Sequence, residues 1–167
     1  MPWLIAAGVV FLWLLWTVAP WFRTGTSTDH REIRGDSVTS IQEIDVPDPP
    51  DDIAHRYIRR LRRLGGFLLW QTYWSENGPS VWCAFIPLIR FGAVRRESDR
   101  ETLTVGTSLF SRRGGTVSFV RKGGKVRVEL RGYRPRLTMF FYRSLQLPVH
   151  AALSRSFLAW LARKNAR

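Results

Sequence analysis

The hydrophobic pattern begins with a mostly apolar stretch over residues 1–22, in which no charged side chain occurs. As a helix it would extend about 33 Å, enough to cross a hydrocarbon core of about 30 Å. Trp3 and Trp21 fall near its two ends, where tryptophan favours the membrane–water interface. A cleaved signal peptide would carry basic residues before the apolar run and small residues after it. Here no Lys or Arg precedes the apolar run, and the residues at its C-terminal end are bulky. The pattern therefore predicts an uncleaved transmembrane helix.

Residues 23–35 are polar and predict a linker, and residues 38–46 have the composition of a strand. The next segment has helical spacing, because its apolar residues recur three and four positions apart. Asp51 or Asp52 is placed to cap this helix, and Gly65–Gly66 to end it. The apolar stripe consists of Ile53, Tyr57, Ile58, Leu61 and Leu64.

Alternating patterns that predict strands dominate the second half of the chain. The clearest is a hairpin in which Gly123–Gly124 joins two strands whose residues alternate between apolar and charged. Residues 81–94 are apolar but interrupted by Pro87 and Gly92, so they fit a short helix, a ligand-covering loop or a membrane-surface contact. The last segment, 144–164, has helical spacing. The predicted strands cover residues 67–74, 102–111, 116–122, 125–133 and 137–142.

Charge is distributed very unevenly along the chain. The formal net charge is +13, and residues 56–167 hold 23 of the 26 basic side chains but only five of the 13 acidic ones. Arg23, Arg31 and Arg34 follow the apolar stretch, and no basic side chain precedes it. Because basic residues accumulate on the cytoplasmic side of a span, we expect a bacterial inner-membrane protein with its N-terminus outside and its domain in the cytoplasm.

The domain predicted over residues 36–167 is α+β, in the order strand, helix, several antiparallel strands and a long C-terminal helix. Its short motifs are Ile44-Asp45-Val46-Pro47, Leu64-Gly65-Gly66, Trp70, the Gly114–Gly115 and Gly123–Gly124 turns, Tyr142, Pro148 and His150. This order resembles the START-like superfamily of polyketide cyclases and lipid-transport proteins, especially its small bacterial members of unassigned function. The resemblance implies a helix-grip fold, in which a curved antiparallel sheet wraps the last helix.

The same resemblance implies an apolar cavity between the sheet and the last helix. A lipid or another hydrophobic ligand would occupy it. The side chains expected to line it are Trp70, Trp82, Phe85, Phe140, His150 and Phe157. The membrane span and the arginine content depart from that superfamily, so a freely diffusing carrier is not the first expectation.

The chain carries no pattern that requires catalysis. Cys83 lies in an apolar run, as a buried thiol would, and the three histidines are scattered along the sequence. No group of residues has metal-ligand spacing, and no phosphate-cradling glycine-rich loop occurs. We therefore predict that the protein is not an enzyme and has no metal or cofactor.

The arginines are the strongest candidates for binding. Four of them, Arg56, Arg59, Arg60 and Arg63, lie opposite the apolar stripe of the first predicted helix, while Arg112 and Arg113 fall in a predicted loop. Beside a cytoplasmic leaflet, anionic headgroups attract such side chains by about 1 kcal/mol each. Acidic surfaces of a neighbouring subunit are the other candidate partner. Nucleic acid ranks below both, because no nucleic-acid-binding motif occurs.

Two tryptophans within the predicted span suggest neighbours in the membrane. Trp13 and Trp16 lie at hydrocarbon depth, away from the interfaces, where contact with protein, pigment, quinone or lipid would suit them. The sequence therefore favours a non-catalytic accessory subunit of a larger bacterial membrane complex, respiratory or photosynthetic. The alternative is a membrane-tethered protein that binds a lipid or another hydrophobic ligand.

Overall fold

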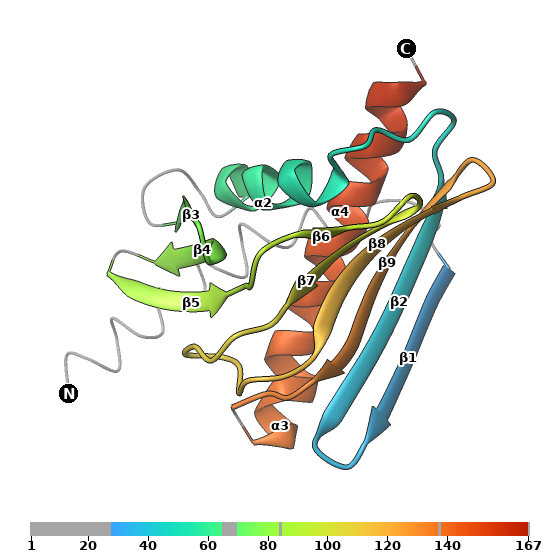
Figure 1. The fold of residues 1–167 in the computed structure, drawn as a ribbon. Helices are drawn as coiled ribbons and strands as arrows, with labels where there is room; N and C mark the ends of the chain where they lie inside the picture. The colour runs from blue at the N-terminus through green and yellow to red at the C-terminus, as the bar shows by residue number, and fades with distance from the viewer. Residues whose placement is uncertain (1–27, 65–69, 84, 137, 167) are drawn as a thin grey trace.

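A computed structural model describes residues 28–64, 70–83, 85–136 and 138–166, whose arrangement appears in Figure 1. The predicted span over 1–22, with Trp3, Trp13, Trp16 and Trp21, lies outside these residues, and so does the predicted Gly65–Gly66 helix end. Within the described part of the chain, no helix is both long enough and apolar enough to cross a membrane.

The larger of two sheets has six antiparallel strands in the order β1-β2-β9-β8-β7-β6. It curves around the C-terminal helix α4, which crosses behind it in Figure 1. Its strands are β1 (Thr28–Arg34), β2 (Ser37–Asp45), β6 (Arg95–Arg96), β7 (Arg100–Thr104), β8 (Thr116–Lys122) and β9 (Lys125–Tyr133).

The β8–β9 hairpin confirms the prediction made from its alternating pattern. Lys122 pairs with Lys125, and the two turn glycines have φ angles of 57° and 71°. Both values are positive, which is the requirement of the tight turn that suits twisted strands. Val126 and Val128 of β9 point into the core, while Arg127 between them is exposed.

Strand β1 corrects the linker prediction over residues 23–35. Residues 28–34 pair with β2 along their whole length, from Thr28 opposite Glu43 to Arg34 opposite Ser37. The hydrophobic pattern missed this strand because β1 is an edge strand rich in charged residues. Backbone pairing holds it in place, and charged side chains are usual on such edges.

A second, smaller sheet resolves the ambiguity of residues 81–94. It consists of β3 (Trp70–Ser75), β4 (Gly78–Cys83) and β5 (Ile86–Arg90), all antiparallel. Phe91 and Gly92 carry the chain from β5 to the larger sheet. The Phe91 N–H donates to the Pro79 carbonyl oxygen at 2.9 Å, and the Gly92 N–H donates to the Thr104 carbonyl oxygen at 2.9 Å.

Helix α2 (Ile53–Leu64) forms where the apolar stripe predicted it. Its cap differs from the prediction. Glu101, a buried residue of β7, accepts a hydrogen bond from the Ala54 N–H at 2.7 Å, so a carboxylate from the sheet satisfies the helix N-terminus. Asp51 instead pairs with Arg121, and Asp52 accepts from the Arg56 side chain at 2.5 Å.

The C-terminal helical region starts earlier than predicted and replaces the strand expected over 137–142. It runs through α3 (Met139–Phe141), a π-helical segment (Tyr142–Gln146) and α4 (Leu147–Asn165). The aromatic content of this stretch favours strands, but Met139 and Tyr142 have helical spacing and both face the core. Packing of that face therefore overrides the local preference.

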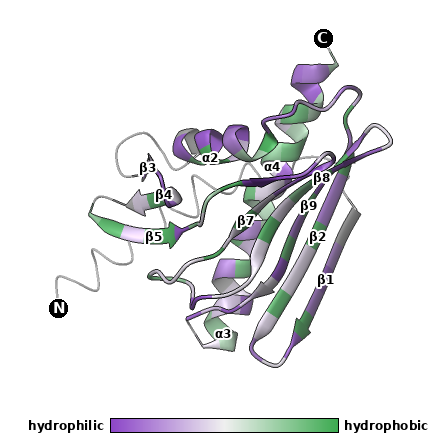
Figure 2. Cartoon of the chain, viewed as in Figure 1, coloured by the Kyte–Doolittle hydropathy of each residue, from purple (hydrophilic) through white to green (hydrophobic). Residues whose placement is uncertain are grey.

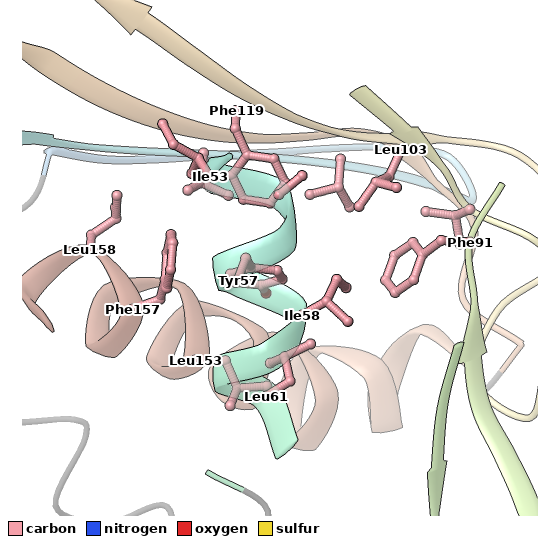
Figure 3. Packing of buried hydrophobic residues seen from close by; sticks show 14 of the residues in the cluster. Ile53, Tyr57, Ile58, Leu61, Phe91, Leu103, Phe119, Leu153, Phe157 and Leu158 are labelled. Carbon is pink, nitrogen blue, oxygen red and sulfur yellow. The ribbon is translucent and has the colours of Figure 1, made fainter. Parts of the chain in front are cut away.

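Aromatic rings from three elements meet at the centre of the core, shown in Figure 3. The Tyr57 ring of α2 lies 5.1 Å from Phe119 of β8 and 5.1 Å from Phe157 of α4, measured between centroids. These distances are typical of favourable edge and tilted contacts between aromatic rings. An α+β fold with a curved antiparallel sheet and a C-terminal helix against it fits the helix-grip arrangement that the sequence resemblance implied.

We predict that Phe157→Ala destabilises the protein far more than Phe140→Ala. Phe157 is fully buried, so its truncation should cost about 3–5 kcal/mol through lost contacts and a cavity. Phe140 is 72% exposed, so its truncation should change the free energy of unfolding by less than about 0.5 kcal/mol. Urea unfolding of the full chain in mild detergent measures both. Equal effects would contradict the packing described here.

Candidate functional site

The side chains expected to line a cavity do not come together. Phe157 fills the centre of the core, and His150 packs against the rings of Tyr133 and Tyr142, at centroid distances of 5.4 and 6.4 Å. In contrast, Phe85 is 89% exposed.

Two more of the six lie away from the helix–sheet interior. Trp82 belongs to the small sheet, where its indole N–H donates to Ser80 at 2.8 Å and the Arg90 guanidinium lies 5.6 Å from its ring. Phe140 is exposed on α3. The Trp70 side chain lies outside the described part. The five described side chains of this set therefore do not form a single aromatic-lined cavity.

A polar cluster occupies the end of the helix–sheet interior near His150. The Tyr133 hydroxyl donates to the Phe110 carbonyl oxygen at 2.8 Å, and the Gln146 amide donates to the Tyr133 hydroxyl. Burial raises the pKa of the Tyr133 and Tyr142 hydroxyls well above the usual tyrosine value, and lowers the pKa of His150 to about 4. The cluster is therefore neutral at pH 7.

The arginines of α2 do form a site, together with the end of α4. A cleft of about 220 Å³ opens between the two helices. Arg60 and Lys164 lie 5.2 and 5.5 Å from the Trp160 ring centroid, within cation–π range. Sequence reasoning missed Trp160 and Lys164, because only the fold brings the end of α4 beside α2. The cleft is lined by Asp52, Arg56, Arg59, Arg60, Trp160 and Lys164.

Local pairs hold two of these arginines in position. Arg56 donates to the Asp52 carboxylate, and Arg59 lies 2.7 Å from the His55 ring nitrogen Nε2. Partial burial raises the pKa of Asp52, but the hydrogen bond and charge of Arg56 outweigh it and hold that pKa below its ordinary value. The carboxylate is therefore ionised at neutral pH. Figure 2 shows α2 as largely hydrophilic. The fourth predicted arginine, Arg63, has its side chain outside the described part.

Arg112 and Arg113 lie at the other end of the sheet. The Arg112 N–H donates to the Arg134 carbonyl oxygen at 2.9 Å, just before β8 begins, whereas Asp51 and Arg121 meet where β8 ends, beside α2. A seven-residue strand is about 20 Å long. The structure therefore separates the two arginine groups that the sequence suggested as one lipid-facing set.

Exposed apolar side chains accompany the arginines at that end. The Leu109 N–H donates to the Pro87 carbonyl oxygen, and the Arg136 N–H donates to the Phe110 carbonyl oxygen, so the loop that holds Leu109 is tied to strand β5 and to the segment after β9. Figure 1 places α3 and the 106–113 loop away from the C-terminus. We name this region the loop-end surface. Its exposed members are Phe85, Ile86, Leu109, Phe140 and Phe141 with Arg112, Arg113, Arg134, Arg136 and Arg143.

Part of the arginine excess serves the sheet itself. Glu129 on the convex face is 1% exposed, and Arg131 donates to it at 2.9 Å. Ion pairs with Arg127 at 3.5 Å and Arg100 at 3.9 Å complete the arrangement. Burial raises the pKa of Glu129, but these arginines outweigh it and keep that pKa below its ordinary value. These side chains therefore have a structural role.

The described groups suit binding of anions. Among residues with described placement, no group of three or more His, Cys, Asp and Glu side chains could hold a metal ion. Arginine and lysine side chains on two surfaces offer hydrogen-bond donors and positive charge, which recognise phosphates and carboxylates. Both surfaces are therefore candidates for contact with anionic partners.

Comparisons with known proteins yield only loose structural likenesses. No protein-family model matches the chain, and no curated protein sequence matches it. CalU16 from Micromonospora echinospora is 16% identical, with a TM-score of 0.43 over 84% of both chains. Ms6760 from Mycobacterium smegmatis is 13% identical, with a TM-score of 0.49 over 85% of this chain and 99% of that one.

A human protein shows a likeness of the same degree. The StarD13 lipid transfer and protein localization domain is 10% identical, with a TM-score of 0.48 over 86% of this chain and 92% of that one. At TM-scores below 0.5, these likenesses are too loose to support any conclusion about what this chain binds.

We predict that His150→Gln makes the protein less sensitive to acid. The folded pKa of about 4 lies below the unfolded value near 6.5, so protonation favours the unfolded chain. The neutral His150 ring contributes fully to the free energy of unfolding above pH 6.5, and this contribution is lost as the pH falls toward 4. Each unit of pKa difference between the folded and unfolded chain is worth about 1.4 kcal/mol. By pH 4.5 the wild type should therefore have lost about 2–3 kcal/mol of its free energy of unfolding through this residue.

Urea unfolding of both chains at pH 7.5 and pH 4.5 measures this difference. The carboxyl groups titrate alike in the two proteins, so they cancel in the comparison. An identical loss of stability in wild type and variant would show that folding does not lower the pKa of His150.

Proposed function

We propose that this chain is a non-catalytic accessory subunit of a bacterial membrane complex. In this proposal the N-terminal apolar stretch anchors the protein, and the basic α+β domain lies against anionic headgroups beside the other subunits. The loop-end surface is the observation that carries the proposal. Five exposed apolar side chains and five exposed arginines share one end of the fold.

The chemistry of that surface suits a bilayer interface. Phe140 and Phe141 are 72% and 58% exposed, which costs free energy in water and gains it among lipid acyl chains. The neighbouring arginines would meet lipid phosphates, with their aliphatic stems along the apolar side chains. A tether at the N-terminus raises the local concentration of the domain at the membrane, so modest contacts suffice to hold it there.

A test of membrane contact uses the full chain reconstituted in nanodiscs. In discs that contain phosphatidylglycerol, we expect residues 106–113 and 134–143 to exchange amide hydrogens more slowly than in discs of phosphatidylcholine alone. The cause is contact of the loop-end surface with anionic headgroups. Hydrogen exchange read by mass spectrometry measures the effect.

A matched variant sharpens this test. Arg112→Gln/Arg113→Gln should lose the difference between the two lipids, whereas Arg59→Gln/Lys164→Gln, with the same change of charge, should keep it. Equal exchange in both lipids for the wild type would refute membrane contact through this surface.

The alternative of a lipid or hydrophobic-ligand binder also has a specific observation in its favour. Among the residues described, the buried side-chain amide of Gln42 and the buried hydroxyl of Tyr142 have no hydrogen-bond partner. Both face the interior between the sheet and α4. Unpaired buried polar groups cost free energy that a ligand or water could recover.

Purification distinguishes the two functions. An accessory subunit should elute from size exclusion in mild detergent together with larger chains, because its contacts survive solubilisation. A ligand binder should elute alone, near its own 19.4 kDa plus detergent, and native mass spectrometry should then show an added lipid or quinone mass. Elution alone without any added mass would contradict both.

A further inference from the structure

The cleft between α2 and α4 concentrates positive charge in a small volume. We propose that it binds a phosphate group, carried by a soluble phosphate ester or by a lipid headgroup. This site lies beside α2, away from the loop-end surface, and it stands apart from the proposed function, since it needs neither a host complex nor membrane contact at Phe140 and Phe141.

The spacing of the cations is unfavourable without an anion. Arg56, Arg59 and Arg60 are three and four positions apart on one helix, where like charges destabilise a helix. Among the described residues that line the cleft, Lys164 adds a fourth cation from α4, and Asp52 is the one carboxylate. A bound anion would relieve this repulsion, and its binding would stabilise the folded state.

The side chains, rather than the helix terminus, would recognise the anion. The Glu101 carboxylate already accepts from the Ala54 N–H, so it occupies the positive end of the α2 dipole. Arg56 and Arg59, by contrast, lie further along α2 and line the cleft. Arginine side chains carry planar forks of N–H donors, which match the oxygens of a phosphate in pairs.

Size and charge favour phosphate over a carboxylate or a peptide. A volume of about 220 Å³ is below the usual range for drug-sized ligands, so it suits a phosphate with a few attached atoms. A phosphate monoester carries up to two negative charges at neutral pH, against four cations here, whereas a carboxylate carries one. Trp160 holds Arg60 and Lys164 against its ring, which orders two of the cations before the ligand arrives.

The test measures binding to the full chain in a non-ionic detergent by titration calorimetry. One arm uses glycerol 3-phosphate in solution, and the other uses detergent micelles that contain phosphatidic acid. Three proteins are compared: the wild type, the cleft variant Arg59→Gln/Lys164→Gln, and the control variant Arg112→Gln/Arg113→Gln. Both variants lose the same charge, and Arg59, Lys164, Arg112 and Arg113 are all exposed, so both should fold.

We expect the cleft variant to bind glycerol 3-phosphate about ten-fold more weakly or worse, because two charge-assisted contacts are lost, while the control variant binds this soluble ester like the wild type. With phosphatidic acid micelles, the cleft variant should lose more affinity than the control variant. Binding in the first arm identifies a soluble ester as sufficient. Binding in the second arm alone identifies a lipid headgroup in the cleft if the cleft variant loses more affinity there than the control variant. The proposal is overturned if neither arm shows binding, or if both variants lose affinity equally, which would indicate attraction by overall charge. None of these results depends on the exchange experiment in nanodiscs.

Discussion

The contact among Tyr57, Phe119 and Phe157 is the interaction on which the rest of the domain depends. It joins α2, the large sheet and α4 at one point, with ring centroids 5.1 Å apart on two sides of Tyr57. Arg60 lies three residues after Tyr57 on α2, and Trp160 lies three residues after Phe157 on α4. Residues three positions apart are neighbours on the surface of a helix, so each of these two cleft residues lies next to an aromatic residue of the core. The packing that forms the core therefore also sets the distance between the two sides of the cleft.

The arginine excess has more than one physical origin. On the convex face, Arg127 and Arg131 surround the buried Glu129, and removal of those charges would leave this carboxylate with only the longer ion pair to Arg100. On α2 the arginines Arg56, Arg59 and Arg60 lie on the face opposite the buried stripe and line the cleft. Net charge alone therefore overstates how much of this surface is available for recognition, and only the fold separates the two groups.

Elements with a strong pattern could be predicted from the sequence, and elements set by tertiary contacts could not. The β8–β9 hairpin and α2 follow from alternation, helical spacing and glycine turns. β1 has no such pattern, because pairing with β2 rather than burial holds it, and residues 137–142 were wrongly predicted as a strand. In the site, helical spacing was enough to predict that the α2 arginines share one exposed face. Trp160 and Lys164 could not be predicted, because only the packing of α4 against α2 brings them beside these arginines.

The junction of the two sheets carries a constraint on sequence change. A Cβ atom at Gly78 would lie 2.3 Å from the Gly92 carbonyl carbon and oxygen, and the φ angle of Gly78 is +118°. Neither the space nor the backbone conformation admits another residue there. A chain that keeps both sheets in this arrangement therefore needs a glycine at this position. Substitution of Gly78 would therefore disturb the contact through which the small sheet joins the larger one.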